Sequence, residues 1–375
     1  MAPAEPARRY ESGDLPELPQ VTVFIPCRNE AGHIADTLNA VLGQTYLAER
    51  MSILLVDGMS TDETRRVARE TLSAQDQVRW KIVDNPLQDL TNANLVAYEH
   101  ITGDVLVYVC AHATIADDYV EAVCRGLREV PCDGIGGPYR MVGRTPNGQA
   151  IAAAMSSPFG VGGAWYRYFS EDKPVDCDPP MASYSTEVLR QIGGMDPVTL
   201  GFGEDWEYYR RARAAGARLY CDPRIHCRFY ARDRFTEFLP HMGKYGTAKG
   251  WLWRRYGSRV LRWTHLLPTA WVAYVGLSTL FALLGHVWAL ALLVGGMAGY
   301  LLAGLWSAVK ACRAAEIPVS LAPRIMLAYA IMHGMYGVFF VKGALVGRGR
   351  AVERKARELE ARLGGIPSVQ GSGAD

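Results

Sequence analysis

The chain has 375 residues, enough for one large domain or two of ordinary size, and carries a net charge of +2 with 21% charged residues. It has no basic excess of the kind that binds nucleic acid, so we expect no nucleic-acid partner. The eight cysteines include no Cys-x-x-Cys pair, which argues against a structural zinc site. The first 20 residues contain no apolar signal-peptide core, so we expect reduced cysteines and a cytosolic N-terminal part.

Residues 1–19 are rich in Pro and Glu and are expected to form a disordered lead-in. Strand-like and helix-like segments then alternate, with strands expected at 21–26, 52–58, 78–84 and 104–109 and helices at 31–42, 60–72, 91–101 and 116–130. Ile34, Leu38 and Val41 share one face of the first helix, and Ser60 or Thr61 is expected to cap the second. Four consecutive βα units predict an α/β fold with a doubly wound, mainly parallel sheet.

Polar residues gather where these strands end, which is where open parallel sheets bind ligands. The ends read Pro26-Cys27-Arg28-Asn29-Glu30, Asp57, Asp84 and Cys110-Ala111-His112. Neither a G-x-G-x-x-G motif nor a Walker loop occurs there, which excludes dinucleotide and P-loop sites. Asp57 suits a hydrogen bond from a ribose hydroxyl or a base N–H, and capping of a turn is its alternative role.

Gly and Pro become frequent after residue 130, so a loop-rich half is expected to pack on the same sheet. It contains one well-formed helix, within the stretch GFGEDWEYYRRARAAG at 201–216. Glu204, Asp205 and Glu207 stand at its start, where the helix dipole favours negative charge, and Gly216 is expected to end it.

The C-terminal part is strongly apolar. Between Trp263 and Val309 there are 47 residues without Asp, Glu, Lys or Arg, enough for two membrane spans of ~20 residues each, at about 265–285 and 287–308. Gly285-His286 is the expected break between them. A third run, Ile325 to Val341, has 17 uncharged residues and is marginal for a crossing. The alternative is the core of a soluble helical domain, but soluble helices show a polar face that these segments lack.

Four stretches, in this order and spacing, resemble the nucleotide-sugar glycosyltransferases of family 2, which have a GT-A fold: VTVFIPCRNE, LLVDGMSTDET, NANLVAYEHITGDVLVYVCAHA and GFGEDWEYYRRARAAG. The likeness is greatest to the membrane-attached succinoglycan-biosynthesis subgroup. It implies transfer of a sugar, with inversion, from a nucleoside diphosphate donor (UDP by default) to an acceptor hydroxyl in polysaccharide or glycoconjugate biosynthesis. The resemblance covers a GT-A domain at 20–250, and the membrane segments also suit that subgroup. From charge and hydropathy we expect an interfacial amphipathic segment at 251–263, a membrane domain at 264–346 and a basic cytosolic tail at 347–375.

Matching positions in the family motifs imply the roles of single residues. The nucleotide pocket would be formed by Pro26, Arg28, Asn29, Glu30, Asp57, Asn92 and Asn94. Helix capping is the alternative for both asparagines. Asp205 would be the base that deprotonates the acceptor, and Glu204 would orient it or bind the acceptor, unless both are ordinary helix-start acids. The acceptor or sugar side would be formed by Asp176, Asp178 and Trp206.

In the family, the strand at 104–109 ends in an Asp-x-Asp or Asp-x-His motif that holds Mg²⁺ or Mn²⁺ against the diphosphate. Here Cys110 stands first and His112 last, and a thiol is a poor ligand for a hard cation. His112 can ligate Mn²⁺ or donate directly to a phosphate oxygen, so we expect Mg²⁺ or Mn²⁺ with a weakened or altered dependence. A soft-metal site would need two further ligands. His241 and Lys244 are expected to meet the diphosphate, or else to be positive flanking charges of the membrane segment.

The expected topology follows from the charges near the apolar segments. Residues 227–263 combine basic side chains with three Trp, a mixture typical of a helix at the headgroup level. Because nucleotide sugars are cytosolic, the catalytic domain is expected at the cytosolic face of the cell inner membrane. A third crossing would export an Arg-rich tail, so 325–341 is expected to be re-entrant or interfacial.

The membrane location favours a lipid-linked or otherwise hydrophobic acceptor. Two alternatives remain at this point: a small secondary-metabolite acceptor, and a non-catalytic scaffold that binds a nucleotide sugar. The scaffold is suggested by Cys110 in place of the usual acid.

Overall fold

The computed structural model describes residues 15–162, 172–199, 203–347 and 349–362. The chain divides into two compact units. The described residues of the first unit fall within Met1–Tyr139, Phe169–Phe229 and Arg350–Asp375, and those of the second within Arg140–Tyr168 and Tyr230–Gly349. Most of the lead-in expected at 1–19 lies outside the described residues.

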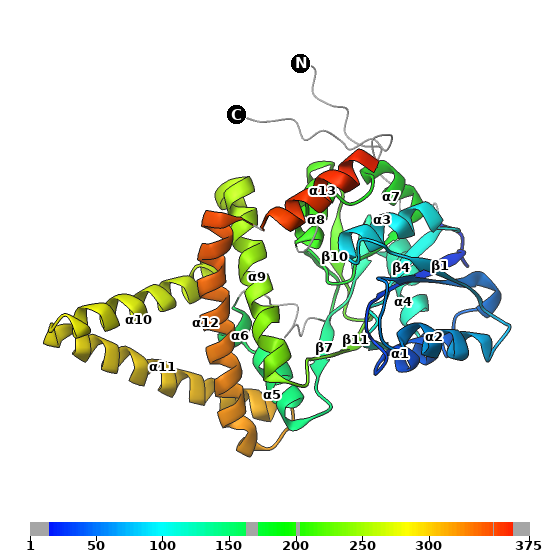
Figure 1. The fold of residues 1–375 in the computed structure, drawn as a ribbon. Helices are drawn as coiled ribbons and strands as arrows, with labels where there is room; N and C mark the ends of the chain where they lie inside the picture. The colour runs from blue at the N-terminus through cyan, green and yellow to red at the C-terminus, as the bar shows by residue number, and fades with distance from the viewer. Residues whose placement is uncertain (1–14, 163–171, 200–202, 348, 363–375) are drawn as a thin grey trace. The chain divides into compact units, whose positions relative to one another are not determined.

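A mixed sheet forms the centre of the first unit (Figure 1). It has eight strands in the order β3-β2-β1-β4-β9-β6-β10-β8. Its strands are β1 (Val21–Cys27), β2 (Met51–Asp57), β3 (Arg79–Asp84), β4 (Val105–Tyr108), β6 (Gly134–Gly136), β8 (Val175–Asp176), β9 (Ser183–Ser185) and β10 (Leu219–Cys221). β1 pairs in parallel with β2 and β4, and β2 with β3. β9 runs antiparallel to both β4 and β6. The first four strands therefore have the arrangement expected from the βα alternation, and the later strands extend the same sheet.

A second sheet has the order β5-β11-β7, with β5 (Ala113–Ile115), β11 (Cys227–Tyr230) and β7 (Tyr139–Val142). β5 and β11 are antiparallel, with Phe229 opposite Ala113. This pairing brings a strand from late in the chain beside the segment that follows β4.

The helices of the first unit are α1 (Ile34–Leu42), α2 (Thr64–Ser73), α3 (Leu90–His100), α4 (Tyr119–Glu129), α7 (Thr186–Ile192), α8 (Glu204–Ala214) and α13 (Arg350–Arg362), with 3-10 turns η1 (Ala48–Arg50) and η3 (Pro197–Thr199). α1 buries Ile34, Leu38 and Val41, the face expected from their spacing. α8 is followed by Gly216 at φ +89, a backbone conformation that glycine adopts without strain. The expected helices are thus confirmed, with boundaries shifted by a few residues.

The start of α2 differs from the expectation. Its N-cap residue is Glu63, and neither Ser60 nor Thr61 caps the helix. Ser60 Oγ donates to Asp57 Oδ1 at 2.6 Å, and the Thr61 N–H donates to Asn29 Oδ1 at 2.9 Å. Both side chains lie in the turn before the helix, where bonds to neighbouring loops replace capping.

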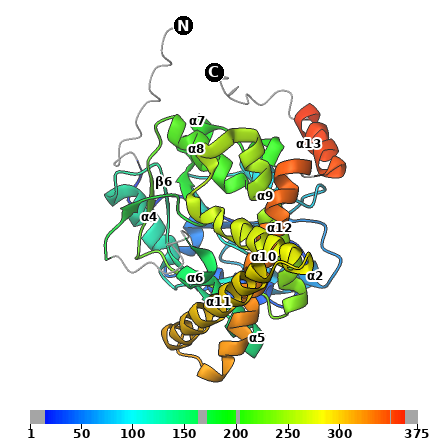
Figure 2. The same cartoon turned by 90° about the vertical axis from the view of Figure 1, so that its left-hand side faces the viewer.

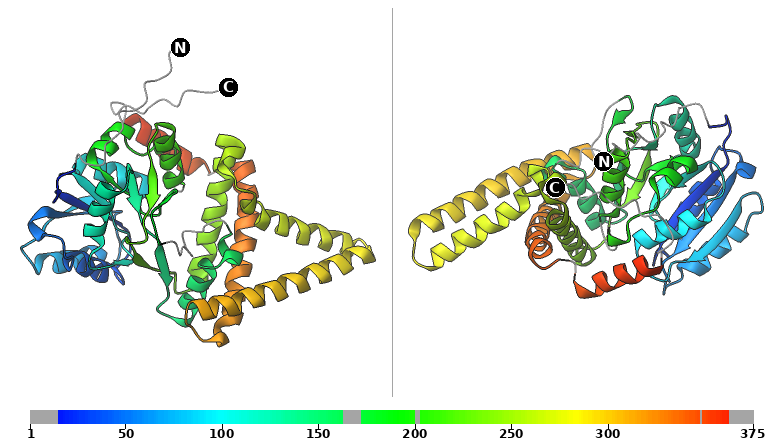
Figure 3. Two further views of the ribbon diagram at one scale, coloured as in Figure 1. Left: turned by 180° about the vertical axis from the view of Figure 1, so that it is seen from behind. Right: turned by 90° about the horizontal axis from the view of Figure 1, so that it is seen from above.

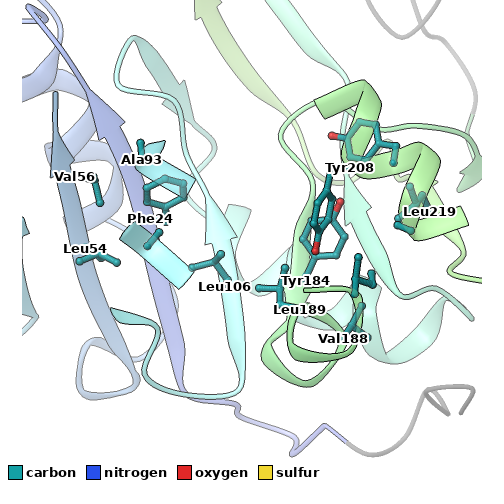
Figure 4. Close-up of a cluster of buried hydrophobic side chains, with 14 residues drawn as sticks. Phe24, Leu54, Val56, Ala93, Leu106, Tyr184, Val188, Leu189, Tyr208 and Leu219 are labelled. Atoms are coloured by element: carbon teal, nitrogen blue, oxygen red, sulfur yellow. The ribbon is translucent and has the colours of Figure 1, made fainter. Parts of the chain in front are cut away.

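One core cluster joins β1, β2 and β4 to α3, α7 and α8. Phe24 of β1 lies between Val56 of β2 and Leu106 of β4, and Tyr184 of β9 meets Tyr208 of α8 (Figure 4). The two tyrosine ring centroids are 5.7 Å apart, and neither residue is more than 6% exposed. Burial of one such large side chain contributes about 1.5–3 kcal/mol. The cluster therefore holds the start of α8 in a defined position on the sheet.

The second unit is helical. Its elements are α5 (Pro146–Met155), α6 (Pro158–Val161), α9 (Phe235–Tyr256), α10 (Leu267–Leu283), α11 (Val287–Ala314) and α12 (Ala322–Val346), with 3-10 turns η4 (Gly257–Val260), η5 (Trp263–His265) and η6 (Val319–Leu321). α12 packs along α9, and α10 and α11 project from that pair as a hairpin (Figures 2 and 3). The hairpin turns at Gly285, where the break was expected.

Three helical segments are long and apolar enough to cross a membrane: Trp263–Leu283, Val287–Ala314 and Val319–Val346. The third contains α12. This helix is longer than the uncharged run at 325–341, and it includes the charged residues Arg324 and Lys342 that flank the run. Gly246 of α9 permits close packing, since a Cβ there would lie 2.4 Å from the Tyr336 carbonyl oxygen. α12 is one continuous helix, and the re-entrant or interfacial position expected for 325–341 stays a prediction.

Candidate active site

Hydrogen bonds fasten the loop after β1 to the loop after β2. Asn29 has φ 54, a left-handed conformation that asparagine tolerates. Its N–H donates to Ser60 Oγ and its Oδ1 accepts from the Thr61 N–H, both at 2.9 Å. The Glu30 N–H donates to Thr64 Oγ1 at 2.7 Å. These bonds hold the polar residues 28–30 at the carboxyl end of β1.

Pro26 and Arg28 flank the end of the same strand. Pro26 is the next-to-last residue of β1 and pairs with Val56 of β2. Arg28 is exposed, and its Nη1 donates to the Gln88 carbonyl oxygen at 3.3 Å, in the loop between β3 and α3. The loops after β1 and β3 are therefore bridged.

Asp57 ends β2 and is 1% exposed. Its carboxylate accepts from Ser60 Oγ at 2.6 Å and from Arg65 Nη1 at 3.3 Å, and Arg65 also binds Asp84 at the end of β3. Burial, and then the nearby Asp57 carboxylate, raise the pKa of the Cys27 thiol well above its ordinary value. The turn-forming role considered for Asp57 is thus present, and its contact with a base or ribose stays a prediction.

The two asparagines of α3 have different surroundings, and neither caps the helix. The cap is Asp89, whose side chain accepts a backbone N–H in the first turn. Asn92 is buried and donates from Nδ2 to Asn85 Oδ1 at 2.5 Å. The Asn85 N–H in turn donates to the Asp57 carbonyl oxygen at 2.8 Å. Asn92 therefore supports the strand ends, whereas Asn94 is half-buried and bonds to the backbone of its own helix.

Cys110 and His112 follow β4 and meet the loop after β1. His112 Nδ1 lies 3.0 Å from Glu30 Oε1, and these side chains are 21% and 12% exposed. The Cys110 Sγ atom lies 3.7 Å from His112 Nε2 and 3.9 Å from Nδ1. The Phe229 ring of β11 packs against the imidazole with a centroid distance of 4.6 Å. His112 is thus surrounded by residues from the segments after β1 and β4 and by Phe229 of β11.

The surroundings of His112 favour its charged form. Burial alone would lower its pKa, but the neighbouring Cys110 and Glu30 outweigh burial and raise the pKa to about 10. The ring is therefore protonated near neutral pH, and both of its nitrogens donate hydrogen bonds.

Two adjacent acids begin α8. Asp205 is exposed and its Oδ1 accepts from the Trp206 N–H at 2.7 Å. Loss of hydration, and then the charges of Asp205 and Asp89, raise the pKa of the half-buried Glu204 to about 8. At pH 7 Glu204 is therefore a neutral hydrogen-bond donor beside a carboxylate that faces solvent.

Tyr108, the last residue of β4, is influenced by the charges of both Cys110 and the two acids of α8. Burial first, and then Cys110, Glu204 and Asp205, raise the pKa of its phenol well above 10, so all three lie within electrostatic reach. Its ring also meets Phe24 of the core at 5.4 Å. The sequence marked Tyr108 only as part of an apolar strand, although its place directly before Cys110 was a usable signal. Cys110, which contacts His112, and the acids of α8 are thus within electrostatic reach of the same tyrosine.

Other expected site residues lie elsewhere or have other partners. Asp176 and Asp178 form ion pairs with Arg213 of α8 at 2.9 and 2.7 Å, which join the edge strand β8 to that helix. His241 and Lys244 lie on α9 in the second unit, where the His241 ring meets Tyr245 at 4.9 Å. Their roles toward acceptor and diphosphate stay predictions.

The side chains present do not fit the divalent cation that the resemblance implies. Among the described residues, no group of three or more His, Cys, Asp or Glu converges as a metal site. The Cys110 sulfur is nearly equidistant from both nitrogens of His112. It therefore lies beside the ring and away from the Nε2 lone-pair direction, where a shared cation would sit. Glu30, the nearest carboxylate to the ring, is paired with His112.

Sequence comparison identifies relatives of the chain. The family described as "Glycosyltransferase like family 2" matches residues 19–243. The dolichyl N-acetyl-alpha-D-glucosaminyl phosphate 3-beta-D-2,3-diacetamido-2,3-dideoxy-beta-D-glucuronosyltransferase of Methanococcus voltae is 25% identical over 244 residues, 63% of this chain and 74% of that protein. The succinoglycan biosynthesis protein ExoA of Rhizobium meliloti is 28% identical over 294 residues, 76% of this chain and 85% of that protein.

Among solved structures, the mannosyltransferase PcManGT from Pyrobaculum calidifontis, in complex with GDP-Man and Mn²⁺, is similar with a TM-score of 0.57 and 19% identity. The match covers 86% of this chain and 88% of that one. At this identity the likeness shows the fold alone, and it confirms the expected GT-A-like α/β domain followed by long apolar helices.

Proposed function

This chain belongs to glycosyltransferase family 2, and on that premise we propose that it transfers a sugar, with inversion, from a nucleoside diphosphate to a hydroxyl of a lipid-linked or otherwise hydrophobic acceptor. The observation that carries the proposal is that Cys110, which contacts His112, lies within electrostatic reach of Tyr108, as do the acids Glu204 and Asp205. Such a site offers a positive group for phosphates and a carboxylate for proton transfer. The relatives named for a dolichyl-linked substrate and for succinoglycan support glycoconjugate or polysaccharide synthesis.

The donor end would lie at the linked loops after β1, β2 and β3. Arg28, Asn29 and Glu30 are held there by hydrogen bonds, with Asp57 and Asn92 beneath them. Open α/β sheets bind nucleotides at this edge. UDP is the default donor nucleotide, and the protonated His112 would face the diphosphate. The side chains present do not fit Mg²⁺ or Mn²⁺.

Asp205 would take the acceptor proton as the new glycosidic bond forms. It is exposed at the first turn of α8, and the core cluster around Tyr208 holds that helix in place. Glu204, neutral at pH 7, would donate a hydrogen bond to the acceptor or to the Asp205 carboxylate. In this proposal Asp205 acts as the base and the adjacent Glu204 acts as a neutral hydrogen-bond donor.

The three apolar helices attach the protein to a membrane. Because nucleotide sugars are made in the cytosol, the proposed site works at the cytosolic face of the inner membrane, where a lipid-linked acceptor presents its headgroup. The basic residues before Trp263 support this orientation.

The base assignment is tested with Asp205→Asn in the detergent-solubilised full chain. Removal of a general base is expected to lower kcat for sugar transfer by about 10²–10⁴-fold, while the dissociation constant of the donor nucleotide stays the same. The measurement is transfer and hydrolysis across a panel of nucleoside diphosphate sugars. Glu187→Gln is the matched control, because Glu187 is also an exposed acid in the first turn of a helix, α7.

Each failure of this experiment has its own meaning. Full transfer activity in Asp205→Asn would show that the base lies elsewhere. Wild-type protein that binds nucleoside diphosphate sugars but neither transfers nor hydrolyses them would be a binding scaffold.

A further inference from the structure

We propose that Val352 of the C-terminal helix α13 is a positioning residue for the base Asp205, because it holds the loop before α8 against α3. This role rests on the proposed sugar-transfer function, since Asp205 is the group that is positioned. α13 follows the apolar helices in sequence but belongs to the same compact unit as the sheet and α8. The link runs from α13 to α3, from there to the loop at 193–199, and then to α8.

Leu95 places an apolar side chain on a different face of α3 from the one that joins the main core. Ala93 and Ala97 are about one helical turn apart, and both belong to the core cluster that joins α3 to the sheet. Leu95 lies midway between them, about 200° around the helix from Ala93, and belongs to a separate cluster. It is nevertheless only 5% exposed. The side chains that pack against it come from three other segments: Leu87, Met195 and Val352.

Val352 is the side chain through which α13 meets this face of α3. It is half-buried, whereas the other α13 side chains that the structure describes are exposed. α13 also lies beside η3, which ends at Thr199. Gly203, the N-cap residue of α8, follows four residues later. α13 therefore covers the segment that leads into the helix of the proposed base.

The loop at 193–199 is joined to α8 by a hydrogen bond as well as by the chain. At Gly194 the backbone approaches α3 closely, since a Cβ there would lie 2.8 Å from Leu95 Cδ2. Arg211 Nη2 donates to the Gly194 carbonyl oxygen at 2.9 Å and pairs with Glu207 Oε2 at 3.2 Å. Glu207 is 1% exposed and stands two residues after Asp205 on the same helix. A shift of this loop is therefore passed to the start of α8.

Turnover and donor binding depend on different parts of this arrangement. A general base acts only within hydrogen-bond reach of the proton that it removes, and a misplacement of about 1 Å can cost about 10²-fold in rate. The proposed donor loops have hydrogen bonds of their own, from the Asn29 N–H to Ser60 and from the Glu30 N–H to Thr64. Loss of the α13 contact therefore lowers kcat and leaves the affinity for the donor unchanged.

The test compares Val352→Asp with wild type, using the full chain in vesicles of native membrane lipids, which contain any lipid-linked acceptor. Release of nucleoside diphosphate from UDP-glucose, UDP-N-acetylglucosamine and GDP-mannose measures turnover. Calorimetry with UDP and GDP gives the dissociation constant and the number of competent sites. A carboxylate placed against Leu95 should lower kcat per competent site by about tenfold or more. The dissociation constant should stay within about twofold of wild type.

Two further variants separate positioning from a general loss of structure. Val352→Ile keeps the apolar contact and should retain kcat within about twofold of wild type. Ala361→Asp is the matched control, because it adds the same charge at an exposed position of α13. Its kcat should also stay within about twofold of wild type.

The outcomes separate this inference from the proposed function. Wild-type kcat in Val352→Asp, or donor affinity reduced as much as kcat, would overturn the positioning role and leave sugar transfer intact. An equal loss of kcat in Val352→Ile or Ala361→Asp would also overturn it. Wild-type protein that releases no nucleoside diphosphate would defeat the proposed function itself. If Val352→Asp does not fold, Val352→Ala decides by the same criteria, with an expected loss of kcat of about threefold.

Discussion

At the scale of single residues, two adjacent carboxyl groups at the start of α8 have different surroundings. Asp205 is exposed, whereas Glu204 is half-buried beside the charges of Asp205 and Asp89, which together with burial raise its pKa to about 8. One acid is thereby kept neutral near pH 7 while its neighbour faces solvent. Similar pairs serve as acid and base in other enzymes, because environment and not residue type sets the role.

This difference predicts a pH dependence of stability. The folded pKa of Glu204, about 8, lies above its ordinary value of 4.5, so between these values only the folded chain holds the proton. The stabilisation is complete below pH 4.5 and is lost as the pH rises through 8. Glu204→Gln, which stays neutral, should lose less stability than wild type on going from pH 5 to pH 9, measured by thermal unfolding in detergent. Parallel pH profiles of the two proteins would contradict the raised pKa.

At the scale of elements, α3 and α4 each follow an aspartate, but only one aspartate is a true cap. The Asp89 side chain accepts the Thr91 N–H at 2.9 Å and so satisfies one of the free donors at the start of α3. Asp118 occupies the same position before α4 and makes no such bond. α3 also carries Asn92 beneath the proposed nucleotide pocket, so the stability of its first turn matters for the site.

We therefore expect Asp89→Ala to destabilise the first unit by about 1 kcal/mol, the usual value of a lost N-cap. Asp118→Ala is the matched control and should change the unfolding free energy by less than about 0.5 kcal/mol. Urea unfolding of the detergent-solubilised chain, followed by tryptophan fluorescence, measures both. Equal effects of the two substitutions would show that the cap contributes nothing specific.

At the scale of the whole molecule, α13 follows the apolar helices in sequence but belongs to the same compact unit as the catalytic sheet. Val352 of α13 packs against Leu95 of α3, together with Leu87 and Met195. This contact requires the tail and the sheet to lie on the same side of a membrane. Three crossings would separate them, so we expect an even number of the three apolar segments to cross.

The burial of the helices indicates which two cross. The most apolar stretches of α10 and α11 are 6% and 11% buried inside the protein, whereas that of α12 is 33% buried, and α12 packs along α9. We expect the α10–α11 hairpin to cross and α12 to stay at the membrane surface. In intact cells, an impermeant maleimide should label His286→Cys at the exposed hairpin turn and should not label Glu353→Cys on α13. The unsubstituted chain provides the background, and labelling of Glu353→Cys before the membrane is opened would refute this topology.

The sequence by itself determined the βα alternation, the buried face of α1, the acids at the start of α8 and the two main apolar segments, because these features depend on local periodicity, helix-end charge and segment length. Only the tertiary structure decided the partners. Glu30 and His112 are 82 residues apart, and Tyr108 of β4 lies within electrostatic reach of Glu204 and Asp205 of α8. Arg213 forms ion pairs with Asp176 and Asp178, which are also distant from it in the sequence. Contacts of this range depend on strand order and packing, which no local pattern along the chain contains.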